Sequence, residues 1–468
     1  MLVEEHPFME PVIAFGALRD VGECQFLDGG NDSGFSYIAL NPVHTISARD
    51  GQVTVDGVEV PGAPFAVLAT MMAGYDVKND PALPPFQGGL VGYFGYDLCH
   101  QLEKLPVPEQ DWLNIPDMLV GIYDAVLSFD LANRRMWIIT HGYLEMGQET
   151  RKTCASLQLA QINGWLSHGP QSFEVDVPAA PALPDIVPWQ TDFNRADYEH
   201  AVRHVLDYIF AGDIFQANLS QSFFAHYGPE NTPDRFSLYR RLRAISPAPF
   251  GAYLEFGAVG ILSNSPERFL KIDTDGRVET KPIKGTRARG TTTLEDATNA
   301  QELLLSEKDR AENVMIVDLL RNDLSKVCEP HSVIATAICQ LESFANVHHL
   351  VSTIEGRLES GKTAIDALAA CFPGGSITGA PKIRAMEIIT ELENRRRGAY
   401  CGAIGFIGFN GAMDTNIAIR TLSIHEGRAA FNVGGGIVAD SIPAAEYDET
   451  LSKAAKLMAA VGIGAELP

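Results

Sequence analysis

The sequence has few cysteines and no regular cysteine pattern. Its 468 residues include seven cysteines, an odd number, which are scattered along the chain and never lie in CxxC spacing. A disulfide framework needs paired cysteines and a zinc cluster needs closely spaced ones, so the pattern argues against both. It favours a protein of a reducing compartment.

Long apolar runs and basic residues are also scarce. No uninterrupted apolar run approaches the ~18 residues of a membrane-spanning helix, and the N-terminal stretch lacks the basic and apolar regions of a signal peptide. Lys and Arg number 36 against 59 acidic residues, which gives a formal net charge of -23. Such a surface repels polyanions, which disfavours nonspecific binding to nucleic acid or anionic membranes. We expect a cytoplasmic protein. Because the net charge is negative, an anionic substrate would have to bind to local positive charge or to a metal.

The residue pattern predicts an α+β fold in two domains. Residues 13–165 contain short alternating segments separated by Gly, Pro, Asn and Asp, which is typical of antiparallel strands and hairpins. A proline-rich segment at 167–188 indicates a linker. We expect an N-terminal β-rich domain, with this linker, at residues 1–188. A second domain follows at residues 189–468.

Helical spacing of apolar residues returns after the linker. We expect four helices, at 196–211 with Gly212 as its C-cap, at 306–324, at 380–397 and at 443–461. Strand-like segments lie between the first two helices. Long strands mixed with separated helices favour an α+β class over regular βαβ alternation.

A lysine at a backbone bend is the first candidate for chemistry. Lys284 lies in the segment PIKGT, where proline restricts the backbone and glycine frees it. It is either a solvated loop residue or an amine with a shifted pKa. Glu267, in SNSPERF, follows a strand and a proline and either faces the same cleft or pairs with Arg268 at the surface.

Two predicted helices each carry a pair of carboxylates one turn apart. Asp309 and Glu312 form one pair, and Glu446 and Glu449 form the other. Residues three apart lie on one helix face, so two facing pairs would offer oxygen ligands to Mg²⁺. The alternative is a capping box at Ser306 and solvated helix faces.

Two glycine-rich segments are candidates for anion sites, and each has a plain structural alternative. The segment GSITGAPK precedes a helix, so its backbone N–H groups can face an anion. The strand glycines Gly434, Gly435 and Gly436 allow close approach of a ligand carboxylate. A tight turn is the alternative for the first segment, and for the second it is the favoured interpretation. The basic run 395–397 is expected to complement the end of the helix at 380–397.

Two further motifs point to chemistry less strongly. The segment GRLESGKT at 356–363 satisfies the phosphate-binding pattern GxxxxGK[ST], but its bulky and acidic variable positions favour a hairpin or turn that leads into a short buried helix. His348 and His349 border an apolar run, where a histidine is more often a core residue than a proton carrier.

Four long motifs together resemble the chorismate-utilising enzyme family. They are PIKGT, EKDRAENVMIVDLLRNDLSKV, GSITGAPKIRAMEII and GGGIVADSIPAAEYDETLSKA, and the N-terminal segments FSYIALNPV and PFQGGLVGYFGYD are similar to the family's leading domain. The resemblance implies an antiparallel β-sandwich-like core wrapped by helices, with the active site in a cleft of residues 189–468. Lys284 and Thr378 resemble the aminodeoxychorismate synthase branch, whereas the anthranilate synthase branch usually has Ala and more often Ser at these positions.

The resemblance also implies roles for individual residues. Glu312 and Glu449 would hold Mg²⁺, with Asp309 and Glu446 behind them, although anthranilate-forming relatives tend to have Glu at position 309. Lys284, Glu267 and His349 would be catalytic. The implied substrate-binding residues are Thr378, Tyr400, Arg420, Gly434, Gly435, Gly436 and Lys453.

The implied reaction is the Mg²⁺-dependent replacement of the C4 hydroxyl of chorismate by ammonia, a step toward 4-aminobenzoate and folate. None of the cysteines has the sequence setting of a glutaminase nucleophile, so a separate glutamine amidotransferase subunit is expected to supply the ammonia. Anthranilate and isochorismate synthases are the nearest alternatives. A nucleotide-dependent regulator and a noncatalytic metabolite-binding subunit remain as alternatives of another class.

Overall fold

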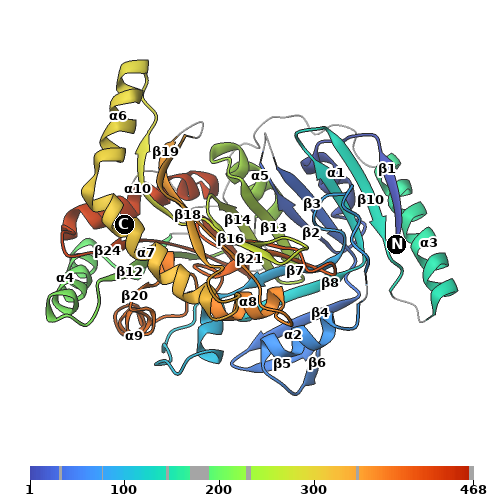
Figure 1. The fold of residues 1–468 in the computed structure, drawn as a ribbon, viewed down its shortest axis with the longest axis horizontal. Helices are drawn as coiled ribbons and strands as arrows, with labels where there is room; N and C mark the ends of the chain where they lie inside the picture. Colours follow the sequence, from blue (N-terminus) through green and yellow to red (C-terminus); the bar gives the residue numbers. More distant parts are fainter. Residues whose placement is uncertain are drawn as a thin grey trace.

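Two large antiparallel sheets form the centre of the molecule (Figure 1). The computed structural model describes residues 1–30, 34–75, 77–143, 147–168, 189–227, 233–343 and 347–462. Each sheet contains 12 strands. Within these ranges no helix has both the length and the apolar character needed to span a membrane.

The first sheet runs in the order β1-β10-β9-β3-β2-β13-β14-β23-β24-β12-β11, and β20 also pairs with β12. Its strands are β1 (Leu2–His6), β2 (Cys24–Asp28), β3 (Phe35–Leu40), β9 (Ala125–Asp130), β10 (Arg135–Thr140), β11 (Gln190–Thr191), β12 (Gln216–His226), β13 (Phe250–Phe256), β14 (Val259–Ser265), β20 (Gly379–Ala380), β23 (Thr421–His425) and β24 (Arg428–Ile437).

The second sheet runs in the order β17-β19-β16-β15-β22-β21-β7-β8-β4-β5-β6, and β18 also pairs with β19. Its strands are β4 (His44–Arg49), β5 (Gln52–Val55), β6 (Val58–Val60), β7 (Gly89–Phe94), β8 (Met118–Tyr123), β15 (Arg268–Ile272), β16 (Arg277–Thr280), β17 (Ile283–Ala288), β18 (Ile334–Ser343), β19 (Val347–Arg357), β21 (Ala403–Gly408) and β22 (Met413–Ile417).

Both sheets contain strands from before and after residue 188. In the first sheet β2 pairs with β13, and in the second β7 pairs with β21. The expected linker, apart from residues 167–168, lies outside the described residues. The boundary at residue 188 therefore separates two stretches of sequence but not two sheets, and as a division into domains it stays a prediction.

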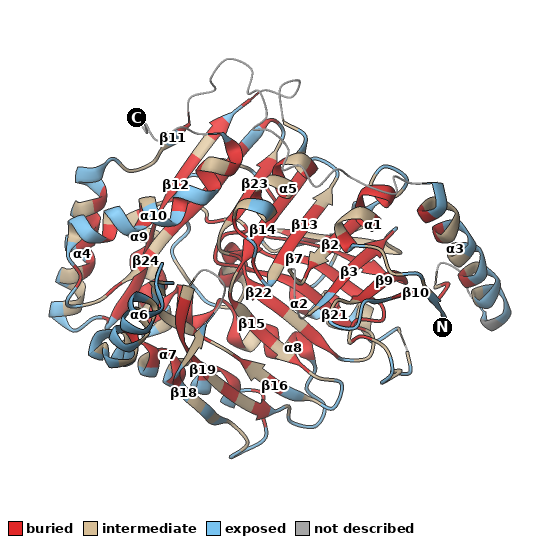
Figure 2. Ribbon diagram, turned by 90° about the horizontal axis from the view of Figure 1, so that it is seen from above, coloured by how far each residue is buried: buried red, intermediate tan, exposed pale blue. Residues whose placement is uncertain are grey.

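The two sheets pack face to face, as expected for a sandwich. Side chains of β3, β9 and β13 from the first sheet meet those of β7 and β21 from the second in one buried apolar cluster. Burial is concentrated in the strands (Figure 2). The α+β class and the sandwich-like core were thus predicted correctly from the sequence.

Helices cover the outer faces of the sandwich. Residues of α1, α3, α5 and α10 pack on the first sheet, and residues of α2, α7 and α8 pack on the second. The helices are α1 (Pro11–Leu18), α2 (Pro64–Met72), α3 (Gln148–His168), α4 (Arg195–Ala211), α5 (Arg235–Ile245), α6 (Thr293–Leu305), α7 (Glu307–Ser325), α8 (Ala364–Cys371), α9 (Lys382–Glu393) and α10 (Pro443–Val461), with short 3₁₀ segments η1 (Tyr96–Gln101) and η3 (Gly375–Ile377).

The strong helix signals of the sequence are confirmed, whereas weak ones were missed. Helices α4, α7 and α10 match the prediction, and Gly212 is the C-cap of α4 with φ 86°. Helices α1, α2 and α3 lie in the stretch expected to be strands. Helix α1 is buried almost throughout and α3 is largely exposed, so neither shows a clear apolar stripe in its sequence (Figure 2).

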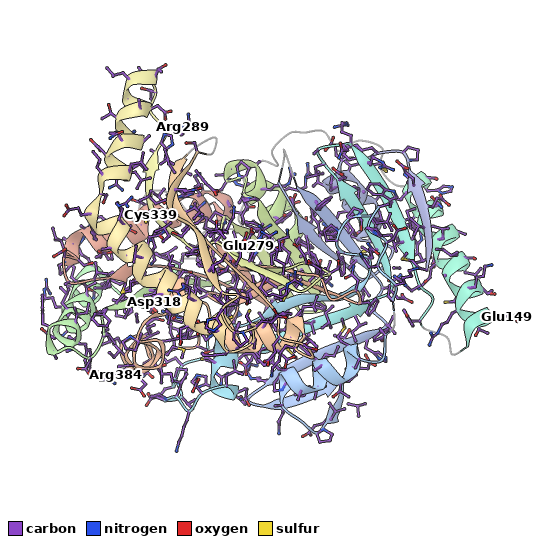
Figure 3. The ribbon with its side chains drawn as sticks, in the orientation of Figure 1. Glu149, Glu279, Arg289, Asp318, Cys339 and Arg384 are labelled. Atoms are coloured by element: carbon purple, nitrogen blue, oxygen red, sulfur yellow. The ribbon has the colours of Figure 1, made fainter. Side chains whose placement is uncertain are left out.

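Helix α6 projects from the body of the molecule (Figure 1). Arg289, labelled in Figure 3, forms an ion pair with Asp296 at 2.7 Å, which ties the segment after β17 to α6. Helix α7 follows directly, with Ser306 as its N-cap accepting from the Asp309 N–H at 3.2 Å. The predicted cap at Ser306 is therefore present.

Candidate active site

The predicted site residues come together in one cleft. It has a volume of about 490 Å³ and is lined by β17, the N-terminal part of α7, the segment around η3, β24 and α10. Every site residue predicted from the sequence lines this cleft except Thr378. Residues more than 100 positions apart in the sequence therefore share one site.

Ser376 connects the two proposed catalytic side chains. The Lys284 Nζ donates to the Ser376 carbonyl at 3.3 Å, and the Ser376 hydroxyl donates to Glu267 Oε1 at 2.8 Å. Ser376 lies in η3, the short turn formed by the GSITG segment. This turn therefore places an amine and a carboxyl group on the same cleft wall.

The environment shifts the pKa of both groups toward their neutral forms. Burial lowers the pKa of Lys284 below that of a solvated lysine, although the charges of Glu312 and Glu267 oppose the shift. Burial also raises the pKa of Glu267, against the effects of the Ser376 hydroxyl and the Lys284 charge. A neutral amine can act as a nucleophile and a protonated carboxyl can act as a general acid.

The three strand glycines let charged side chains approach β24 closely. A Cβ at Gly435 would lie 3.3 Å from Glu446 Oε2, and a Cβ at Gly436 would lie 3.3 Å from Lys284 Nζ. The Gly434 carbonyl accepts from Lys453 Nζ at 2.8 Å. The backbone here packs directly against the reactive groups of α10 and β17.

Carboxylates of α7 and α10 face the cleft, and charged or hydrogen-bonding groups of the protein surround each of them. Burial raises the pKa of Glu312 and of Glu446, and the Ser441 hydroxyl donates to Glu446 at 2.6 Å. Burial would also raise the pKa of Glu449, but Lys453, at 2.7 Å, holds it below its usual value. Asp309 forms an ion pair with Arg287 at 3.2 Å.

These carboxylates offer the oxygen ligands that a magnesium ion prefers. In the described part of the chain, no three acidic, His or Cys side chains form a ready metal cluster. Mg²⁺ needs only one or two protein carboxylates and completes its shell with water and substrate oxygens. The charge of Glu446 adds to the raised pKa of Glu312, and a cation between the two helices would offset that repulsion. The ligand roles of Glu312 and Glu449 stay a prediction.

His349 and Arg420 occupy the same cleft. The Thr286 hydroxyl and His349 Nδ1 are 2.8 Å apart, and burial lowers the pKa of this histidine to about 4. It is therefore neutral near pH 7 and can accept a proton. Burial also lowers the pKa of Arg420, whose guanidinium has no ion pair or hydrogen bond among the described residues. Such a cation suits a substrate carboxylate.

Sequence reasoning missed several cleft residues and near neighbours, among them Ser376, which lines the cleft and bonds Glu267. Lys308, Asn218 and Asn432 line the cleft. Gln216, fully buried beneath Gly436, has no partner for either side-chain atom within the described structure. Lys308 lies four residues before Glu312 on α7, so helical periodicity could have found it. Asn218, Asn432 and Gln216 lie on strands, and their position follows from the strand pairing.

Several predicted features lie elsewhere. Thr378 is fully buried and its hydroxyl donates to the Gly374 carbonyl at 3.0 Å, so it does not reach the cleft. His348 pairs with Asp296 at 2.9 Å outside the cleft. The GRLESGKT segment runs from the end of β19 through a turn into α8, where Thr363 and Asp366 form a capping box, so the turn interpretation is confirmed.

The basic run 395–397 was interpreted wrongly. Helix α9 ends at Glu393 and Asn394 is its C-cap, so the three arginines lie beyond the helix and do not cap it. Arg395 and Arg396 bind carboxylates from distant parts of the chain, whereas Arg397 binds Glu393, the last residue of α9. Arg395 pairs with Asp192, Arg396 pairs with Asp117 and Arg397 pairs with Glu393.

A family model of chorismate binding enzymes matches residues 23–459. The chain belongs to the chorismate-binding enzyme family. The matched stretch contains the whole cleft. The protein is thus a chorismate-utilising enzyme, and the cleft is its candidate active site.

Relatives of two activities are similarly close. The chain is 40% identical to anthranilate synthase component 1 of Thermus thermophilus over 96% of this chain and 95% of that one. It is 40% identical to aminodeoxychorismate synthase component 1 of Salmonella typhimurium over 91% and 89%. It also superposes on anthranilate synthase component I of Streptococcus pneumoniae with a TM-score of 0.79, 35% identity and coverage of 90% and 91%.

Proposed function

We propose that the protein is an aminodeoxychorismate synthase component I, which replaces the C4 hydroxyl of chorismate with an amino group. The observation that carries this proposal is the arrangement of Lys284, Ser376 and Glu267. The Lys284 amine, as nucleophile, and the Glu267 carboxyl group, as proton donor, both form hydrogen bonds with Ser376 on the cleft wall. The relatives' names alone support anthranilate synthase equally well.

In the first step Lys284 attacks C2 of the ring as the neutral amine. A bond forms between Nζ and C2, the electrons of the conjugated diene shift along the ring, and the C4–O bond breaks. Glu267 gives its proton to the departing hydroxyl, which leaves as water. Burial favours the required form of each group, since the pKa of Lys284 is lowered and that of Glu267 is raised.

In the second step ammonia forms a bond to C4. The electrons shift back along the ring, the bond between C2 and Nζ breaks, and Lys284 leaves as a neutral amine. The new ammonium group passes one proton to the Glu267 carboxylate, so both residues return to their starting forms. His349, neutral because burial lowers its pKa to about 4, can assist a proton step.

Two cofactor and partner proposals accompany this mechanism. Glu312 and Glu449 would hold Mg²⁺, with Asp309 and Glu446 behind them, and the ion would neutralise the ring carboxylate of chorismate. Arg420, Tyr400, Lys453 and the β24 glycines would contact the substrate. A glutamine amidotransferase subunit would deliver ammonia, and the relatives' designation as component 1 supports a partner of some kind.

Product identification tests the proposal. The protein is incubated with chorismate, Mg²⁺ and ammonium, and the product is analysed by mass and fluorescence. A product with an amino group in place of one hydroxyl and with the enolpyruvyl group retained supports the proposal. Fluorescent anthranilate, or an isomer of chorismate, would assign the protein to the anthranilate or isochorismate synthase branch instead.

A further inference from the structure

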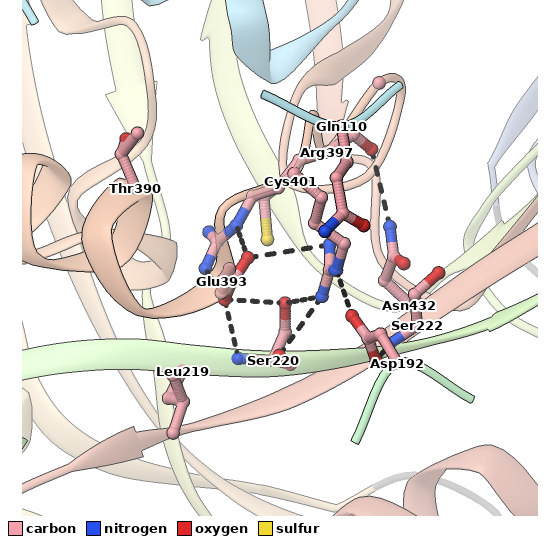
Figure 4. Close-up of polar contacts among 12 residues, drawn as sticks. Gln110, Asp192, Leu219, Ser220, Ser222, Thr390, Glu393, Arg397, Cys401 and Asn432 are labelled. Atoms are coloured by element: carbon pink, nitrogen blue, oxygen red, sulfur yellow. Dashed lines mark hydrogen bonds and ion pairs between the residues drawn. The ribbon is translucent and has the colours of Figure 1, made fainter. Parts of the chain in front are cut away.

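A buried ion pair lies directly behind the inner wall of the cleft. Glu393 and Arg397 are 6% and 3% exposed and form a two-point contact, at 2.7 and 3.0 Å. Figure 4 shows the pair between β12 and the segment after α9. Glu393 also accepts from the backbone N–H and hydroxyl of Ser220, at 2.8 and 2.9 Å.

Arg397 connects segments that line the cleft, although it does not line the cleft itself. Its guanidinium donates to the Asn218 carbonyl at 2.6 Å and to the Ile377 carbonyl at 3.3 Å. Its own carbonyl accepts from Asn432 Nδ2 at 3.4 Å, and its guanidinium lies 5.7 Å from the centre of the Tyr400 ring. One side chain therefore contacts β12 and η3, and the residue as a whole also reaches β24 and the loop before β21.

The cost of burying this pair calls for an explanation. Desolvating two charges costs several kcal/mol per ion, and apolar residues of the same volume are often equally stabilising. Burial would raise the pKa of Glu393, but Arg397 and Arg395 hold it below its usual value, so the pair stays ionised. Only a planar, permanently charged group can bind one carboxylate at two points and two carbonyls in fixed directions.

We propose that Arg397 is a positioning residue for substrate binding. It sets the spacing of Asn218, Ile377, Tyr400 and Asn432 around the bound ring. Lys284 and Glu267 hydrogen-bond Ser376, and Arg397 contacts that turn only through the Ile377 carbonyl at 3.3 Å, its longer carbonyl contact. Loss of its forked contacts therefore weakens chorismate binding more than it slows the chemical step. The role does not depend on which product the enzyme makes.

The test compares Arg397→Lys with a matched control, Arg395→Lys. Arg395 is equally buried and belongs to the same cluster, but it donates to Asp192 and Ser220, neither of which lines the cleft. Chorismate consumption is followed with Mg²⁺ and ammonium present. For Arg397→Lys the KM for chorismate is expected to rise about tenfold with kcat changed less than about threefold. For Arg395→Lys both constants stay within about twofold.

Three results would overturn the proposal. The first is an unchanged KM in Arg397→Lys. The second is an equal rise in KM in Arg395→Lys, since the effect would then be general destabilisation. If Arg397→Lys does not fold, the double variant Glu393→Gln/Arg397→Gln, which keeps polar groups of similar shape without charge, is measured instead. The third is that neither Arg397→Lys nor this double variant folds, because the cluster is then required for folding and not for positioning.

Discussion

At the scale of single residues, the state of Lys284 decides the chemistry. A solvated lysine is protonated at neutral pH and is no nucleophile, whereas burial lowers the pKa of Lys284. The Ser376 carbonyl accepts a hydrogen bond from it on the cleft wall that also holds Glu267. A small uncharged side chain at position 284 would leave no amine hydrogen-bonded beside Glu267.

Replacing Lys284 tests covalent catalysis. Lys284→Ala and Lys284→Arg are both expected to reduce C4 amination to below about one per cent, since alanine has no amine and arginine does not deprotonate. Mass spectrometry of the protein incubated with chorismate should show a substrate adduct on Lys284 in the wild type and none in either variant. Undiminished amination by Lys284→Ala would refute the covalent step.

Ser376→Ala tests the link between the two catalytic groups. The Ser376 hydroxyl stabilises the Glu267 carboxylate and so holds its pKa down. Without it the pKa of Glu267 rises, because the charged form loses a hydrogen bond. Glu267 must be protonated to act as the acid, so its pKa sets the pH at which kcat/KM falls on the alkaline side. In Ser376→Ala this alkaline limb should move to higher pH, and the maximal rate should fall roughly tenfold.

Ser128→Ala is the matched control for this change. Ser128 is also buried, and its hydroxyl donates to the Phe86 carbonyl at 2.9 Å, away from the cleft. Its profile should match that of the wild type. A Ser376→Ala enzyme that is slower at every pH, with both limbs unmoved, would mean that Ser376 has only a structural role.

At the scale of elements, α7 and α10 present their acidic edges to one cleft. On each helix two carboxylates lie one turn apart, and the β24 glycines let α10 pack close to the strand. Neighbouring lysines, Lys308 and Lys453, partly offset the negative charge. The arrangement suits a cation that arrives with an anionic substrate.

We expect the activity to require Mg²⁺ and the binding of Mg²⁺ to require Glu449. Chelation of divalent cations should abolish turnover, and added Mg²⁺ should restore it. Glu449→Gln should reduce activity at least about 100-fold and weaken Mg²⁺ binding measured by calorimetry with chorismate present.

The neighbouring residue Asp448 provides the control for that measurement. It pairs with Arg195 of α4 on the exposed side of α10, so Asp448→Asn should leave the magnesium response unchanged. Full Mg²⁺-dependent turnover in Glu449→Gln would exclude this residue as a ligand.

At the scale of the whole molecule, the sandwich is assembled from both halves of the sequence. Phe406 of β21 packs against Tyr37 of β3 and Phe86, with ring centres 5.3 and 4.7 Å apart. This cluster lies between the two sheets. The two sheets are therefore expected to unfold together.

Phe406→Ala is expected to destabilise the entire fold. Loss of a buried aromatic ring from a core costs about 3–5 kcal/mol. In urea, fluorescence and circular dichroism should show one coincident transition at lower denaturant concentration. The exposed Val107 serves as the control, and Val107→Ala should leave the midpoint unchanged. Separate transitions for the two signals would contradict a shared core.

A fragment of residues 189–468 tests the same point directly. Without residues 1–188, β13 loses β2 and β21 loses β7, so both sheets are left with long unpaired edges. The fragment should not form a stable soluble monomer. A folded fragment that binds chorismate would establish residues 189–468 as an independent domain.

The sequence alone determined the features that depend on neighbours along the chain. The Ser306 cap, the Gly212 C-cap and the carboxylate pairs of α7 and α10 follow from residue spacing, because hydrogen bonding and helix geometry relate residues a few positions apart. The antiparallel strands and the sandwich class followed from alternation and from the family's motifs.

Only the tertiary structure decided how distant segments meet. Ser376 and Glu267 are 109 residues apart, and Arg397 reaches Asn218 across 179. No local pattern states that the Thr378 hydroxyl bonds the Gly374 carbonyl outside the cleft, that Arg395 and Arg396 bind Asp192 and Asp117, or that strands from both sides of residue 188 share two sheets. These contacts depend on how the sheets pair and pack, and that pairing is set by the summed burial of many side chains, which no single stretch of sequence contains.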